Sequence, residues 1–80
     1  QMLRLSKKAD YALIAMRHLA AGEPGSSSSA REIAESYAIP AELLAKVLQR
    51  LVRARLLVSV QGTRGGYKLG RPAHQMTVAD

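Results

Sequence analysis

The stretch IPAELLAKVLQRLVRARLL, residues 39–57, constrains the fold more than any other part of the chain. Its apolar residues recur at steps of three and four, which places them along one side of an α-helix. They are Leu43, Leu44, Val47, Leu48 and Leu51. The other side carries Glu42, Lys46, Arg50 and Arg53, with Ala45 and Gln49 between them. Pro40 suits a first helical position because its missing amide hydrogen leaves no hydrogen bond unmade. We predict a helix from Pro40 to Arg55 with one buried side and one side suited to an anionic partner.

Size and composition limit the chain to one small basic domain. A chain of 80 residues without Trp or Phe must build its core from aliphatic residues and Met. Twelve Lys and Arg oppose six Asp and Glu, and a sequence pI of about 10.3 favours nucleic acid or another acidic surface as the partner. The alternative is that the basic residues form only a solvated face.

Several function classes are disfavoured by what the chain lacks. It has no Cys, which removes disulfides, thiolate metal sites and iron–sulfur ligation by this chain. Two His and six carboxylates form no spaced nucleophile–base or metal constellation, so we expect neither an enzyme nor a small-molecule substrate. No apolar run reaches the ~20 residues of a membrane span, and no signal-peptide layout is present. We therefore expect a cytoplasmic protein without membrane partners.

A first helix is predicted from the N-cap Ser6 to Ala21, where Gly22 ends it. Apolar residues cover most of its circumference, so part of this surface is expected to serve a second subunit. Its start gathers Arg4, Lys7 and Lys8 beside helix amides that attract anions. The alternative is that these cations are merely exposed.

His18 lies on a crowded side of this helix, and we expect it to be packed or half-exposed rather than a ligand.

A short second helix is predicted by S-x-x-E at residues 29–32, the capping-box pattern. It follows a polar loop at residues 23–28 and continues to Tyr37. The basic segment begins three or four residues later, which is the spacing of a helix-turn-helix.

After Leu56 the pattern alternates, as in a β-hairpin. Val58 and Val60 face one way, and Tyr67 and Leu69 repeat the alternation around Lys68. The GTRGG sequence, residues 62–66, forms the predicted tip, with Arg64 at its apex. An enzymatic phosphate loop is disfavoured because the G-x-x-x-x-G-K-[ST] spacing is absent.

Finally, T-x-x-D at residues 77–80 is typical of a helix start, so we expect a fourth helix and a further C-terminal part.

Together these elements predict a winged helix-turn-helix, mainly helical with a two-stranded wing, over residues 1–80. The sequence resembles the Rrf-two family of bacterial repressors, which includes the iron–sulfur regulator IscR and the nitric-oxide sensor NsrR. The resemblance covers nearly the whole chain and lies in three segments, LRLSKKADYALIAMRHLA, AREIAESYAIPAELLAKVLQRLVRARLLVSVQG and GGYKLGRPAHQMTVAD. The opening L-R-L-S-K-x-x-D-Y-A is most similar to the branch that regulates the SUF cluster-assembly system.

The resemblance implies a homodimeric transcription factor, such as a repressor, that binds a pseudo-palindromic operator in double-stranded DNA. Its third helix would enter the major groove and its wing the minor groove. The positions that match the family's DNA contacts are Arg4, Ser6 and Lys8 for the backbone, Glu42, Leu43, Ala45 and Lys46 for the major groove, and Gln61 and Arg64 for the wing. Gln61 replaces the Arg usual before the first wing glycine, and Ala45 stands where some members carry Glu, so a known operator cannot be carried over. Members that bind an iron–sulfur cluster hold its Cys ligands beyond the matched segment, which leaves a cluster in a longer protein open and none in this chain.

From the residues themselves we expect two kinds of DNA contact. Phosphates would be bound by Arg4, Lys7, Lys8, Arg53 and Lys68, and base edges by Lys46, Gln49 and Arg50. The alternative function is a basic protein-interaction module, whose working face would be the apolar surface of the first helix.

Overall fold

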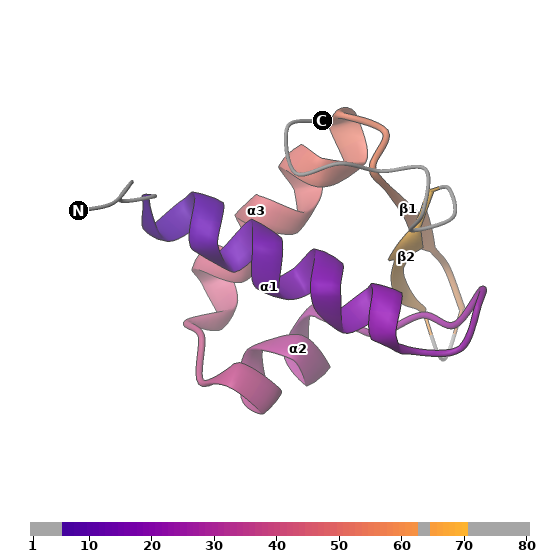
Figure 1. Ribbon diagram of the computed structural model, residues 1–80, viewed down its shortest axis with the longest axis horizontal. Helices are drawn as coiled ribbons and strands as arrows, with labels where there is room; N and C mark the ends of the chain where they lie inside the picture. The colour runs from indigo at the N-terminus through magenta and orange to yellow at the C-terminus, as the bar shows by residue number, and fades with distance from the viewer. Residues whose placement is uncertain (1–5, 63–64, 71–80) are drawn as a thin grey trace.

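The computed structural model describes residues 6–62 and 65–70 of the 80-residue chain. Within these residues three helices precede a two-stranded antiparallel hairpin (Figure 1). The elements are α1 Lys7–Ala21, α2 Ala30–Tyr37, α3 Ala41–Arg53, β1 Leu57–Val60 and β2 Gly66–Leu69. This order confirms the predicted winged helix-turn-helix. The predicted wing apex at Arg64, the N-terminal Arg4 and the helix start at Thr77 lie outside the described residues.

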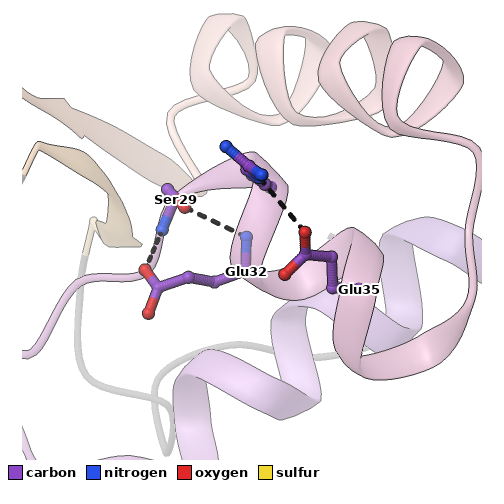
Figure 2. A network of polar contacts seen from close by, with 4 residues as sticks. Ser29, Glu32 and Glu35 are labelled. Atoms are coloured by element: carbon purple, nitrogen blue, oxygen red, sulfur yellow. Dashed lines mark hydrogen bonds and ion pairs between the residues drawn. The ribbon is translucent and has the colours of Figure 1, made fainter.

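Side-chain caps begin the first two helices where the sequence predicts them. The Ser6 hydroxyl accepts a hydrogen bond from the Ala9 amide at 3.1 Å, and α1 ends at Ala21 as expected. At α2 the Ser29 hydroxyl accepts the Glu32 amide at 3.0 Å, and the Ser29 amide donates to the Glu32 carboxylate at 2.8 Å (Figure 2). Both partners of the capping box are therefore satisfied, which fixes the first residue of this eight-residue helix.

The third helix is shorter than predicted at both ends. Pro40 is its N-cap rather than its first residue, and the Pro40 carbonyl accepts the Leu44 amide at 3.0 Å. The helix ends at Arg53 because Arg55 turns left-handed, with φ of 66°. The Leu56 amide then donates to the Leu51 carbonyl at 3.0 Å, which is the closing bond of a Schellman motif.

A similar left-handed residue separates α2 from α3. Ala38 has φ of 55° and ψ of 45°, and the Ile39 amide donates to the Ala34 carbonyl at 2.9 Å. Three residues thus connect the two helices, within the predicted spacing of a helix-turn-helix.

The core lies where α1 and α2 pack against α3 and the hairpin closes one end (Figure 1). Its buried members are small or aliphatic, as the composition requires: Ala15, Leu19, Ile33, Ala34, Ile39, Leu44, Leu48 and Leu57. Tyr11, Ile14 and Met16 of α1 pack against this core but stay half-exposed, and the expectation that part of the α1 surface serves a second subunit stays a prediction. Of the described helices, α1 is the longest, with 15 residues, and no described helix has the length and hydropathy to span a bilayer.

The wing strands pair Leu57 with Leu69 and Val58 with Lys68. Leu57 is 2% exposed and enters the core, whereas Val58 is 42% exposed on the outer side. The predicted tip is one residue too long at its C-terminal end, because Gly66 already belongs to β2. A segment that the sequence does not reveal as a strand joins the outer edge of β2, where the Ser28 and Tyr67 amides donate to each other's carbonyls at 3.0 and 2.8 Å.

Candidate nucleic-acid interface

The two sides of α3 divide as its sequence pattern predicts. Leu44, Val47 and Leu48 are buried against the rest of the fold. The exposed polar residues are Glu42, Lys46, Gln49, Arg50 and Arg53. Leu43 and Ala45 are half-buried. The helix therefore presents a polar and mostly basic surface across its length, because Leu44, Val47 and Leu48 turn the centre of its apolar side into the fold.

The N-terminal turn of α1 lies beside this basic side of α3. A shallow groove of about 200 Å³ is lined by residues from both helices, namely Lys8, Lys46, Val47, Gln49, Arg50 and Arg53. Lys8 and the α3 residues are far apart in sequence and were predicted separately as anion contacts, and the packing of α1 on α3 brings them together. We call Lys8, Lys46, Gln49, Arg50 and Arg53 the basic groove. Lys7 is exposed next to Lys8 but does not line the groove.

The cations of the basic groove have no carboxylate within ion-pair distance among the described residues. Over residues 6–62 and 65–70, the one ion pair joins Arg31 and Glu35 within α2, at 3.1 Å (Figure 2). Four cations around a small groove repel one another, and an anion bound there relieves this repulsion. Glu42 is exposed in the first turn of α3, where a carboxylate complements the helix dipole. The charge distribution thus favours a polyanionic ligand along the remaining length of the helix.

The predicted wing residues that the structure describes, Gln61 and Lys68, do not line the basic groove. Lys68 is half-buried on β2 opposite Val58, and Gln61 is exposed directly after β1. Ser6 uses its hydroxyl to cap α1, which leaves its second lone pair free for another donor. Within the described residues, no group of three or more His, Cys, Asp or Glu is placed to hold a metal ion.

Sequence reasoning missed two features of the structure, one in the basic groove and one at the opposite end of α1. Val47, predicted as a core residue only, is 3% exposed and also lines the basic groove. His18, which is half-buried as expected, forms hydrogen bonds to residues of two other segments. Neither contact has a signal in the sequence, because both depend on how distant segments pack.

Comparison with known proteins agrees with this architecture. The family model "Rrf2: Iron-dependent Transcriptional regulator" matches residues 5–80. A Mycobacterium tuberculosis protein is 37% identical over 78 residues, and BadM of Rhodopseudomonas palustris is 44% identical over 78 residues. Both are named as HTH-type transcriptional regulators. Each match covers 98% of this chain but 48% and 49% of these relatives, so the chain spans about half their length.

Solved structures of similar sequence share the fold. CymR, the global cysteine regulator of B. subtilis, superposes with a TM-score of 0.91 at 32% identity, covering 99% of this chain and 61% of that protein. IscR of T. potens superposes with a TM-score of 0.89 at 33% identity, covering 98% of this chain and 57% of that protein. The family resemblance is confirmed, while the narrower similarity to the SUF-regulating branch stays a prediction. The chain belongs to the Rrf2 family of transcriptional regulators.

Proposed function

We propose that this chain is the DNA-binding part of a transcriptional repressor and that α3 enters the major groove of double-stranded DNA. The observation that carries this proposal is the basic groove, in which Lys8 of α1 joins the exposed residues of α3. The 13 residues of α3 extend over roughly 20 Å, and the major groove of about 12 Å width admits one α-helix. Its exposed side therefore meets base edges while its buried side keeps the fold intact.

The proposed contact residues fall into two groups, those that reach base edges and those that bind phosphates. Lys46, Gln49 and Arg50 occupy the exposed side of α3, and their donors suit the acceptors of purine edges. Lys7, Lys8 and Arg53 lie at helix ends and bind phosphates, which fixes the register without reading sequence. The wing brings Gln61 and Arg64 to the adjacent minor groove, while Lys68 of β2 binds a phosphate. The roles of Arg4, Ser6, Glu42, Leu43 and Ala45 follow the family resemblance.

The intact regulator works as a cytoplasmic homodimer on a pseudo-palindromic operator, since two copies related by a two-fold axis read two half-sites. The family description includes iron dependence. This chain has no cysteine, so the thiolate ligands of an iron–sulfur cluster would have to come from elsewhere. The proposed DNA contacts do not depend on a cluster.

Selection of bound duplexes from a random pool, followed by titration, tests this function. The chain should enrich a related set of duplexes and bind them more tightly than scrambled duplexes of equal length. A basic protein-interaction module would instead show no salt-dependent affinity for any duplex, and that outcome would refute the proposal.

A further inference from the structure

A polar cluster at the other end of α1 from the basic groove joins three separate segments of the fold. His18 Nδ1 is hydrogen-bonded to the Tyr37 hydroxyl of α2 at 2.8 Å, and His18 Nε2 to the Ser28 hydroxyl at 3.3 Å. The imidazole and phenol rings meet edge to face, with centroids 5.5 Å apart and planes at 89°. Both ring nitrogens are thus engaged, which fixes the orientation of the imidazole.

Ser28 connects this cluster to the wing. Its backbone pairs with Tyr67 through two hydrogen bonds along the outer edge of β2. The neighbouring Gly66 permits this approach, because a Cβ atom at that position would collide with the Ser28 carbonyl. The wing strand is therefore held on one edge by β1 and on the other by the segment that His18 contacts.

The His18 contacts differ from the other side-chain hydrogen bonds among the described residues. Those bonds are local, since each stays within a helix or between a helix and its own cap: Ser6 with Ala9, Ser29 with Glu32, and Arg31 with Glu35. Among the side-chain hydrogen bonds of residues 6–62 and 65–70, only those of His18 join elements that are distant in the sequence. Its side chain is half-buried and Tyr37 is 43% exposed, so the cluster lies at the surface and is not part of the apolar core.

We propose that His18 is a positioning residue that holds the wing in register with the helix-turn-helix unit. The Tyr37 hydroxyl orients the imidazole by its hydrogen bond to Nδ1, and the imidazole fixes Ser28 by its hydrogen bond through Nε2. The Ser28 backbone then pairs with Tyr67 at the outer edge of β2. The consequence for DNA rests on the function proposed above, because the wing and α3 must meet the same duplex at a fixed separation. The link between His18 and the wing is a property of the free protein and does not depend on that function.

Amide hydrogen exchange in the full chain without DNA tests the link itself. Loss of the imidazole in His18→Ala should speed exchange at the Ser28 and Tyr67 amides about tenfold relative to the Leu48 amide in the core. His18→Gln extends an amide to the reach of Nε2 and should restore protection, whereas His18→Asn reaches only the position of Nδ1 and should not. Ile39→Val serves as a control that lowers stability in the core without touching the cluster.

The two results that decide this test are distinct. The positioning role is supported if His18→Ala speeds exchange at the Ser28 and Tyr67 amides but not at Leu48, and if His18→Gln restores slow exchange. Unchanged exchange at these two amides, or equal acceleration at Leu48 as in Ile39→Val, overturns it.

Footprinting tests the consequence, using a duplex selected from a random pool by the wild-type chain. His18→Ala should lose minor-groove protection at the wing while it keeps major-groove protection by α3, and affinity should fall about tenfold. An unchanged pattern of protection at lower affinity would overturn the positioning role, since a general loss of stability weakens all contacts together. Absence of any footprint with the wild-type chain would overturn the proposed DNA binding, while the exchange result would still decide the role of His18.

Discussion

Replacing Lys8 by alanine should weaken binding to every duplex equally, whereas replacing Lys46 or Arg50 should weaken binding to the selected duplex most. All three side chains line the basic groove, so a purely electrostatic role would make them equivalent. They differ in position, because Lys8 lies at the start of α1 and the other two lie on the exposed side of α3. Phosphate contacts carry no sequence information, while base contacts do.

The magnitude follows from the number of cations placed at phosphates. Among the described residues these are Lys7, Lys8, Arg53 and Lys68, which gives about eight phosphate contacts for a dimer on its operator. The logarithmic salt slope should then be about −7, a loss of roughly 10⁴-fold in affinity between about 50 and 200 mM salt. Lys8→Ala removes two contacts per dimer and should reduce the slope to about −5. Lys46→Ala or Arg50→Ala should cost about 1–3 kcal/mol on the selected duplex and relax its sequence preference.

Fluorescence anisotropy with selected and scrambled duplexes, repeated over a series of salt concentrations, measures both effects. Arg17→Ala is the matched control, since it removes one charge from α1 nine residues after Lys8 and so on the opposite side of the helix. It should change the salt slope by much less than Lys8→Ala. Equal losses for Lys8→Ala, Lys46→Ala and Arg50→Ala on both duplexes would refute this division between phosphate and base contacts.

Three further predictions concern stability, and urea unfolding followed by circular dichroism measures each. Leu48→Ala should cost about 3 kcal/mol because Leu48 is fully buried in the core, and a loss below about 1 kcal/mol would contradict that packing. Ser29→Ala should cost about 1 kcal/mol by removing the hydroxyl of the capping box, and no loss would show that this cap does not stabilise α2. Ala38→Gly should stabilise the chain by about 0.5–1 kcal/mol, because relief of the left-handed φ of 55° exceeds the added entropy of the unfolded chain. A destabilised Ala38→Gly variant would contradict the geometry assigned to the turn.

The sequence predicts the elements of this fold well where local chemistry defines them. Ser6, Ser29 and Glu32 cap their helices with their own side chains, so the starts of α1 and α2 can be read from the residue types. The end of α3 could not be read in this way. Arg55 adopts a left-handed conformation, which is unfavourable for a residue other than glycine. Burial of the Leu56 side chain outweighs this local cost, and the residue types alone do not reveal it.

The sequence predicts most residues of the candidate interface but not how they are arranged in space. Helical periodicity places Lys46, Gln49 and Arg50 on one side of α3, and composition indicates an anionic partner. The position of Lys8 beside them depends on how α1 packs against α3, which periodicity does not determine. The pairing of Ser28 with Tyr67 was not predictable either, because a single bridging residue in a Ser-rich loop has no strand pattern.

Titration of the isotope-labelled chain with a selected duplex, followed by amide chemical shifts, tests the central claim most directly. The claim is that the basic groove is the surface that meets DNA. It predicts the largest shift changes at Lys8 and along the exposed side of α3, at Lys46, Gln49, Arg50 and Arg53. Changes centred instead on α2 around Glu32 and Glu35, with the α3 amides unaffected, would contradict it.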